Sequence, residues 1–376
     1  MRFNHARHTV FVLIVFTTLA GCAGPTTKRP EVNEAAVAEE AKKQREFALR
    51  EAVRNEQRLH DVAWPILAAG RPLCIDRYRR ATGIKYSNKH NIPEEMQDAA
   101  VSEFDMGENL QILAIAEGSP AALAGLQVGD IIMSVNGESA PVGEEAAKKM
   151  AELIKEQGEK SDQLDFVVHR EGISNTINVT PVEICDYPVL VVNKDDVNAF
   201  ADGNNIFVTQ GMMDFTRSNN ELSLVVAHEL AHNNMRHIKA KKTNYLLGFL
   251  ADLLLGGLTG VDLGIRYAAA QAYSKDFEAE ADYVGMYIMA RAGNELEGAP
   301  EFWRRMGIRN PESIEDNYLA SHPSTPERFV ALEDSIEEIR QKQETGQELM
   351  PNIDEADRQE REPPPAPAGA AQLGLD

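Results

Sequence analysis

The chain has 376 residues, of which 43% are hydrophobic and 26% are charged. This composition excludes both wholesale disorder and a polytopic membrane protein, and the length suits two compact domains with tails. Lys and Arg number 38 against 59 Asp and Glu, which gives a formal net charge of −21. We exclude nucleic-acid binding, because that function needs a basic surface to neutralise phosphates.

The N-terminus has the pattern of a secretion signal. Two arginines precede an apolar run over 9–20, and the run ends in Leu-Ala-Gly-Cys at 19–22. The run is shorter than the roughly 20 apolar residues of a membrane-spanning helix and ends in small residues, so we expect its removal. It resembles the signal of bacterial lipoproteins, which implies cleavage before Cys22 and acylation of the Cys22 thiol. The alternative is an ordinary signal peptide that contains a cysteine by chance.

The residue after Cys22 bears on where such an anchor lies. It is Ala23 and not aspartate. By resemblance to the lipoprotein sorting rule of enteric bacteria, this implies an anchor in the outer membrane of a Gram-negative cell envelope, with the protein facing the periplasm. Anchoring in the inner membrane is the alternative, because sorting rules differ between bacteria.

The rest of the chain changes character several times. Residues 31–61 are rich in Ala, Glu, Lys and Arg, which favours a polar helical spacer; an ordinary packed first helix is the alternative, since Phe47, Leu49 and Val53 are apolar. The C-terminal residues are polar and Pro-rich, a composition that does not fold alone. We predict a signal peptide, a tether, a β-rich module, a helical domain with a small sheet and a disordered tail, over 1–21, 22–73, 74–185, 186–340 and 341–376.

The β-rich module carries a recognisable motif. Short β-type runs surround one helical stretch at 143–157, and residues 118–137 read GSPAALAGLQVGDIIMSVNG. This stretch resembles the PDZ domains of bacterial envelope proteases. The resemblance implies capture of an extended peptide by strand addition, with its terminal carboxylate received by the loop at Thr82, Gly83 and Ile84. A spacer that binds no peptide is the alternative.

Two cysteines remain once Cys22 is assigned to the anchor. Cys74 and Cys185 bracket the β-rich module. An even pair in an oxidising compartment predicts a disulfide, which would hold the two ends of the module together. Two buried free thiols are the alternative.

The central motif is His228-Glu229-Leu230-Ala231-His232, in an apolar run that favours a helix. Positions i and i+4 lie on one face of a helix, so both imidazoles can reach one metal ion. Glu229 is one step round the helix, where it can act as a general base on the attacking water. Two buried core histidines without a metal are the alternative that these five residues leave open.

A second acidic cluster can complete the site. Hydrolytic zinc sites take three protein ligands and leave the fourth position to water. Glu278 and Asp282 lie four residues apart in a segment flanked by apolar runs, so one can bind metal while the other accepts a hydrogen bond from a ligand histidine. Glu280 is a rival to Glu278, and a solvated acidic helix face is the alternative to both.

Several motifs over 188–332 resemble the HtpX- and BepA-like gluzincin family, relatives of the CAAX prenyl proteases. They are the two clusters above together with 198–200, Arg236-His237, His322-Pro323 and Arg328. The resemblance implies an α+β fold, with a mainly helical metallopeptidase domain, and one Zn²⁺ per chain. It also implies His228, His232 and Glu278 as ligands, with Glu229 as the base, and prefers Glu278 to Glu280 because the family ligand stands four residues before the aspartate.

Further residues are expected around the site. Asp282, His322 and Arg328 are candidates for supporting the ligands or contacting the transition state, and for His322 a fourth-ligand role and a purely structural role both stay open. We expect His237 to be structural. We predict an edge strand for extended substrate at 205–209, and a core helix pair or a lid over 245–265, where two aspartates disfavour a membrane span.

These features predict a zinc-dependent endopeptidase of the cell envelope that degrades misfolded or misassembled envelope proteins. Its partners would be protein or peptide substrates, misfolded outer-membrane proteins among them, and the membrane that holds its lipid anchor. The alternative function is a chaperone-like or scaffolding lipoprotein that binds client peptides through its PDZ domain.

Overall fold

The computed structural model describes residues 26–27, 30–244, 246–247, 274–309 and 326–353. The fold is α+β, which confirms the predicted class. Among the described residues, those from Glu46 onward form one compact unit, and those up to Arg45 belong to another. Three of the predicted features, Cys22, His322 and most of the 245–265 run, lie outside the described residues.

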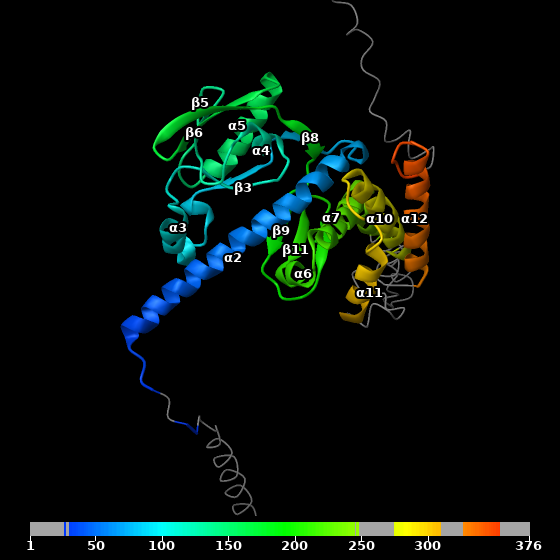
Figure 1. The fold of residues 1–376 in the computed structure, drawn as a ribbon, viewed down its shortest axis with the longest axis horizontal. Helices are drawn as coiled ribbons and strands as arrows, with labels where there is room; N and C mark the ends of the chain where they lie inside the picture. The colour runs from blue at the N-terminus through cyan, green and yellow to red at the C-terminus, as the bar shows by residue number, and fades with distance from the viewer. Residues whose placement is uncertain (1–25, 28–29, 245, 248–273, 310–325, 354–376) are drawn as a thin grey trace, which may run out of the picture. The chain divides into compact units, whose positions relative to one another are not determined.

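The β-rich module follows the long helix α2 (Figure 1). Its central sheet has the strand order β2-β3-β4-β6-β7, with β5 paired to β4. In chain order the elements up to the end of the module are α2 (Glu34–Ala69), η1 (Arg71–Leu73), β1 (Tyr78–Ala81), β2 (Ile84–Ser87), η2 (Lys89–Asn91), η3 (Glu94–Met96), α3 (Gln97–Phe104), β3 (Gln111–Ile115), α4 (Pro120–Ala124), β4 (Ile131–Val135), β5 (Glu138–Ser139), α5 (Ala146–Lys160), β6 (Leu164–Arg170), β7 (Ile173–Val179) and β8 (Val182–Cys185).

Alternation along the strands builds the core of this module. Leu164, Phe166 and Val168 of β6 are fully buried, and the residues between them are more exposed. This period of two puts every second side chain on the core face of the sheet. The β4–β5 hairpin turns at Asn136 and Gly137, whose φ angles of 50° and 83° are the positive values that a tight two-residue hairpin requires.

The two ends of the module are held together. β1 pairs with β8 in antiparallel register, with Tyr78 opposite Cys185, and Cys74 and Cys185 are joined by a disulfide. The chain therefore enters and leaves the module at one place, next to the domain that follows.

The second domain is mostly helical. Its small sheet has the order β10-β11-β9, with β10 antiparallel and β9 parallel to β11. The elements are β9 (Val189–Val192), β10 (Ala199–Ala201), β11 (Ile206–Thr209), α6 (Gln210–Phe215), α7 (Asn219–Asn234), α10 (Ser274–Arg291), α11 (Ala299–Arg309) and α12 (Pro326–Glu344).

The sheet order corrects one prediction. The strand expected at 205–209 as an edge strand is β11, which is central and paired on both sides. Residues 199–209 form a hairpin, and its second strand returns beside β9, so β10 and β9 take the two edge positions within the described sheet. The pattern of apolar residues shows that a strand is buried but not which strands flank it.

Helix α2 also differs from the predicted tether. From Leu59 to Leu67 it is largely buried and shares one core cluster with α7 and α10. Leu59, Val62, Ala63, Ile66 and Leu67 recur at the i, i+3, i+4 spacing of an amphipathic helix. The second half of the predicted tether is thus part of the helical domain.

The same stretch of α2 contacts both domains. Gln57 exchanges two hydrogen bonds with the backbone of Ile115 at the end of β3 (2.8 and 3.1 Å), and His60 Nε2 donates to the Gly83 carbonyl (2.9 Å). Arg58 lies between them in sequence and donates to the backbone carbonyl of Met213 in α6 and to those of Thr216 and Ser218 in the turn before α7.

The predicted disordered tail begins later than expected. Helix α12 continues to Glu344, and Leu349, Met350 and Ile353 pack against the core of the helical domain. The prediction is therefore wrong for residues 341–353, where three apolar side chains within five residues are enough to hold the chain to the surface.

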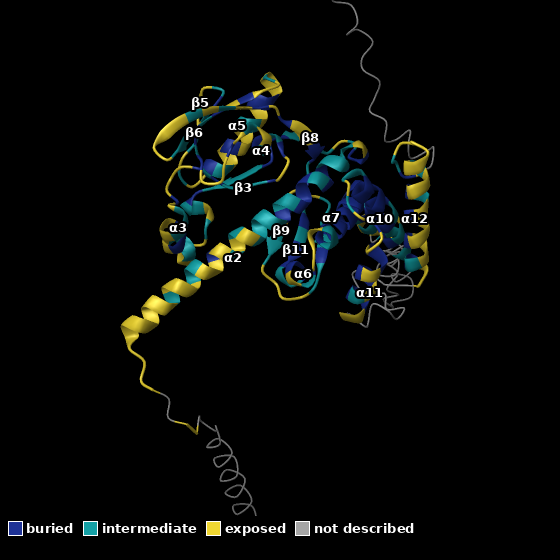
Figure 2. Ribbon diagram, in the orientation of Figure 1, coloured by how far each residue is buried: buried dark blue, intermediate teal, exposed yellow. Residues whose placement is uncertain are grey.

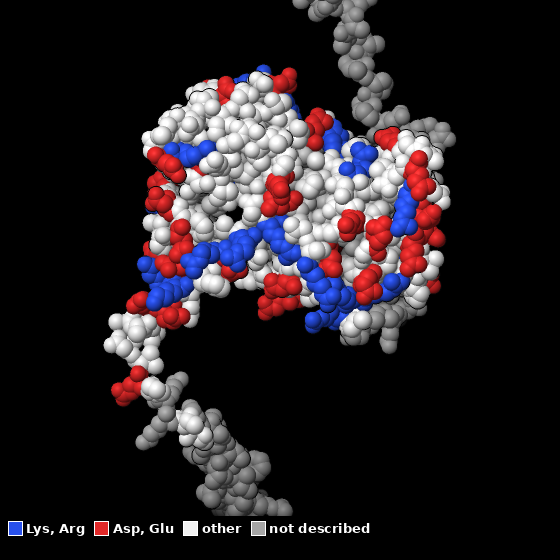
Figure 3. Space-filling model, in the orientation of Figure 1, with Lys and Arg blue, Asp and Glu red and all other residues white. Residues whose placement is uncertain are grey.

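Burial and charge are unevenly distributed. Figure 2 shows buried residues concentrated in α7 and α10, and in Figure 3 acidic side chains gather over α12 while basic ones follow α2. None of the helices among the described residues combines the length and the apolar composition that a bilayer crossing requires.

Replacing both Cys74 and Cys185 by Ser should destabilise the protein. The bond spans 111 residues of sequence, and opening so long a loop raises the entropy of the unfolded chain, so we expect a loss of about 2–5 kcal/mol in the free energy of unfolding. Urea denaturation of both proteins measures it, and reductant should reduce the wild type to the stability of the variant. Two alkylated thiols in native material under non-reducing conditions would contradict the bond.

Candidate metal centre

Helix α7 carries the central motif through the middle of the domain. The Ser218 side chain accepts a hydrogen bond from the Glu221 amide (3.2 Å), and the Glu221 carboxylate accepts one from the Arg217 amide (2.8 Å), which together cap the start of the helix. Every residue from Leu222 to Asn234 is buried. Such a helix is surrounded by protein on all sides, so its buried polar residues need partners within the fold.

Helix α10 supplies those partners by packing closely across α7. A Cβ atom added at Gly285 of α10 would lie 3.3 Å from the Cα and N atoms of His228, which is tighter than ordinary side-chain contact. Glycine at this point lets the two helix backbones approach. Asp282 lies about one turn and Glu278 about two turns before Gly285 on α10, and both reach the His228 side chain.

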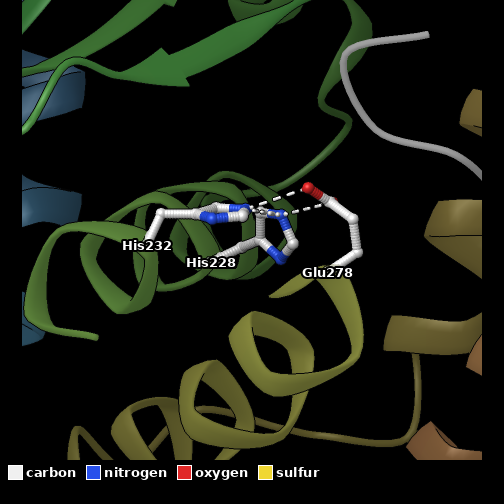
Figure 4. Close-up of side chains that lie close together, drawn as sticks. All are labelled: His228, His232 and Glu278. Atoms are coloured by element: carbon white, nitrogen blue, oxygen red, sulfur yellow. Dashed lines mark hydrogen bonds and ion pairs between the residues drawn. The ribbon is translucent and has the colours of Figure 1, made fainter. Parts of the chain in front are cut away.

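Three donor groups converge between the two helices (Figure 4). The Nε2 atoms of His228 and His232 lie 3.1 Å apart. Glu278 Oε2 lies 3.3 Å from His228 Nε2, and Glu278 Oε1 lies 3.3 Å from His232 Nε2. All three side chains are at most 3% exposed. Within the described ranges, this is the group of His, Cys, Asp and Glu donors that can hold a metal ion.

The spacing of the donors fits zinc. A tetrahedral zinc ion with bonds of about 2.0–2.1 Å separates its donor atoms by about 3.3 Å, which agrees with the distances between His228, His232 and Glu278. Two imidazoles and one carboxylate are also the ligand set of hydrolytic zinc sites, in which the fourth position is left to water. The residues present therefore fit one Zn²⁺ per chain.

Electrostatics point the same way. Burial by itself would lower the pKa of His228, but hydrogen bonds to the Asp282 and Glu278 carboxylates raise that pKa to about 10. Burial lowers the pKa of His232 to about 4, against the opposing effect of Glu278. The Asp282 and Glu278 carboxylates thus favour a positive charge at His228, and a divalent cation can supply that charge in place of the ring proton.

Asp282 and Arg328 support the His228 side of the cluster. His228 Nδ1 lies 3.0 Å from Asp282 Oδ1, and Arg328 binds Asp282 through two hydrogen bonds of 2.7 and 2.9 Å. All three are buried. Burial would raise the pKa of Asp282, but the Arg328 charge holds it below its usual value. An ionised Asp282 at this distance suits the role predicted for it, as acceptor of the His228 ring proton on the side of the ring away from Glu278 and His232.

Glu229 and the hairpin border the donor cluster. The Glu229 side chain is buried, and its charge acts on both His232 and Arg328. Asn233, next to His232, accepts a hydrogen bond from the Gly203 amide (2.9 Å) and donates one to the Asn205 carbonyl (3.2 Å). The β10–β11 turn is therefore fixed to the end of the helix that carries the histidines.

The structure distinguishes Glu278 from Glu280, the two candidates for the third metal ligand. It places Glu278 between the two histidines, and it places Glu280 against His237, with a side chain 47% exposed. The roles of Glu229, Asp282 and Arg328 stay predictions, and His322 lies beyond the described part of the chain. Sequence reasoning missed Trp303, whose ring lies 5.0 Å from that of His228, and no sequence signal points to it.

The loop predicted to receive a peptide carboxylate is tightly built. Gly83 has φ +90°, and a Cβ there would lie 2.2 Å from that of Ser119, so no other residue fits without rearrangement. Ile84 follows and begins β2, which is at the edge of the module's described sheet. A strand at an edge has backbone groups available for strand addition; peptide binding itself stays a prediction.

Comparisons with known proteins agree with both domains. Residues 169–336 match the model of peptidase family M48, and residues 111–161 match that of the PDZ domain. The mitochondrial metalloendopeptidase OMA1 of Arabidopsis thaliana is 29% identical over 214 residues, which cover 54% of this chain and 41% of that protein. The beta-barrel assembly-enhancing protease of Escherichia coli (strain K12) is 24% identical over 173 residues, which cover 40% of this chain and 34% of that protein.

The matches cover less than half of each of those relatives. A solved structure of the HtrA3 PDZ domain bound to a phage-derived ligand covers 28% of this chain and 88% of that chain, at 22% identity and a TM-score of 0.22, which is too low to bear on the fold. Residues 169–336 are thus similar to M48 metallopeptidases and residues 111–161 to PDZ domains, and the histidine–glutamate cluster lies inside the M48 match.

Replacing Arg328 by Met should destabilise the protein strongly. It leaves the Asp282 carboxylate buried without its cation, and breaking a buried pair in this way costs about 3–5 kcal/mol. Arg340→Met is the matched control: it breaks an ion pair with Glu297 whose side chains are 46% and 62% exposed, and solvent screens such a pair so that it contributes little to stability. Urea denaturation compares them, and equal losses would show that Arg328 is not a buried structural partner of Asp282.

Proposed function

We propose that this protein is a zinc-dependent endopeptidase of a bacterial cell envelope, acting in protein quality control. The observation that carries the proposal is the convergence of His228, His232 and Glu278 on one buried point, with Glu229 on the same helix as the histidines. The M48 match over 169–336 supports peptide-bond hydrolysis as the reaction.

The chemistry divides between the metal and the chain. Bound zinc would supply a Lewis acid that polarises the scissile carbonyl and makes water more acidic. Glu229 takes a proton from the attacking water and later delivers it to the leaving amine. Negative charge develops on the carbonyl oxygen as water attacks, and bound zinc would offset it. Asp282 and the ligand Glu278 balance the positive charge of the ion, and burial of the cluster strengthens these interactions by excluding solvent.

Strand β10 is the element that supports an extended substrate best. It pairs with β11 on one side within the described sheet, and its hairpin is fixed by Asn233 beside His232. A substrate strand laid along β10 gains main-chain hydrogen bonds that do not depend on its sequence. Unfolded protein segments of varied sequence are therefore the substrate class that we propose.

The PDZ domain would add a second point of capture. An edge strand that begins at Ile84, directly after the Gly83 turn, suits the C-terminal segment of a polypeptide. The Escherichia coli relative is named for enhancing β-barrel assembly, and we take misassembled outer-membrane proteins as the substrates that this chain would meet in the envelope.

Replacing Glu229 by Gln should abolish cleavage of casein while leaving zinc in place. The amide keeps the shape of the side chain but cannot take the proton, so kcat/KM should fall by about 100-fold or more. Glu278→Ala should lose zinc as well as activity, because it removes a ligand. Elemental analysis and a casein assay on the purified mature protein measure both.

Glu333→Gln is the matched control, because Glu333 is an exposed residue of α12 whose side chain is 58% accessible; it should cleave like the wild type. Unchanged cleavage by Glu229→Gln would sink the proposed mechanism. A wild-type protein that never cleaves casein but prevents its aggregation would instead establish the chaperone-like function.

We also propose that the mature protein begins at an acylated Cys22 and is held to the outer membrane. This rests on the signal pattern at the N-terminus. Cys22→Ser should move the protein from the membrane fraction to the soluble periplasmic extract, and intact mass of the wild type should show the added acyl chains. A wild-type mass equal to that of the unmodified chain would contradict the anchor.

A further inference from the structure

A third histidine lies behind the candidate metal ligands. His237 is 1% exposed and does not belong to the donor group. Its Nδ1 atom is 2.9 Å from Nδ1 of His232, and its Nε2 atom is 2.9 Å from a carboxylate oxygen of Glu280. His232 therefore has a partner on the side of its ring that faces away from His228 and Glu278.

The backbone is shaped to bring His237 to this place. On a continuous helix, residue i+5 lies about 140° around the axis from residue i and does not touch it. Helix α7 ends at Asn234, and Arg236 takes a left-handed conformation with φ +60°, which is uncommon for a residue other than glycine. The chain then folds back over the helix end, and Phe277 of α10 stacks on the His237 ring with 4.6 Å between ring centroids.

The Glu280 carboxylate determines which ring nitrogens of His237 and His232 carry a proton. The Glu280 carboxylate can only accept, so His237 Nε2 carries a proton and donates it. A neutral His237 then accepts at Nδ1, and His232 donates from its own Nδ1. That leaves the lone pair of His232 on Nε2, the atom next to His228 and Glu278. The opposite order would place a proton among the metal donors.

We propose that His237 and Glu280 are positioning residues, which hold His232 in the tautomer and the orientation that bind zinc. They do for His232 what Asp282 and Arg328 do for His228. A carboxylate behind an imidazole also raises the basicity of that ring as a ligand. The inference deepens the proposed function and rests on its zinc site.

The two supports differ in their surroundings. Asp282 and Arg328 are buried, whereas the Glu280 side chain is 47% exposed, so solvent screens its charge. We therefore expect removal of Glu280 to weaken zinc binding less than removal of His237, because His237 touches the ligand and Glu280 acts through it.

The test is the zinc affinity of the mature full-length protein, measured by competition with a chromogenic chelator. His237→Leu removes the acceptor for the His232 ring proton, and zinc affinity should fall by about 10- to 100-fold. His237→Gln should recover most of the affinity, because an amide can accept from His232 and donate to Glu280. The zinc affinity of Glu280→Ala should fall by a smaller factor. In the cobalt-loaded proteins, the shift of the d–d absorption bands should be larger for His237→Leu than for Glu280→Ala.

Tyr283→Phe is the matched control. It lies on α10 as Glu280 does and loses a hydrogen bond to Glu338 (2.9 Å), away from the ligands, so it should lower the melting temperature without changing zinc affinity. Wild-type affinity in His237→Leu, with only a lower melting temperature, overturns the proposal. If His237→Leu does not fold, Glu280→Ala decides: wild-type affinity and an unshifted cobalt spectrum overturn it. A wild type that binds no zinc overturns both this proposal and the proposed function.

Discussion

The close packing of α10 on α7 is the contact on which the functional site depends. A methyl group at Gly285 would lie 3.3 Å from the His228 backbone, closer than ordinary contact. At this close approach Glu278 contacts both imidazoles and Asp282 contacts that of His228. Because the cluster is buried, each charged member needs a partner of opposite sign or a hydrogen bond. The carboxylates of α10 and the Arg328 side chain of α12 meet that need.

The arrangement of partners gives each candidate ligand a defined orientation. His228 is held from behind by Asp282, and His232 by His237, so both rings present Nε2 to the same point. An imidazole without such a partner can rotate or exchange tautomers, and an ion then finds its donors only part of the time. Preorganised donors reduce that loss, which is why residues that never touch the metal matter to the site.

Helix α2 extends the same frame to the PDZ domain. Arg58 holds the turn that begins α7, while His60 and Gln57 hold the Gly83 carbonyl and the end of β3. The disulfide between Cys74 and Cys185 fixes the module a few residues further along. One helix thus contacts both the start of the zinc-binding helix and the turn predicted to receive peptide, and the separate cores of the two domains are joined through it.

The sequence by itself determined the features that depend on local spacing. Two histidines four residues apart share a helix face whatever surrounds them, and the run at 118–137 indicates its turns by its glycines. The tertiary structure decided the rest. Glu278 and Glu280 point about 200° apart on α10, and only the packing against α7 selects Glu278 for the metal and turns Glu280 to His237. The order of β9, β10 and β11 and the burial of α2 were decided the same way, because they depend on contacts between segments far apart in the chain, which no local pattern records.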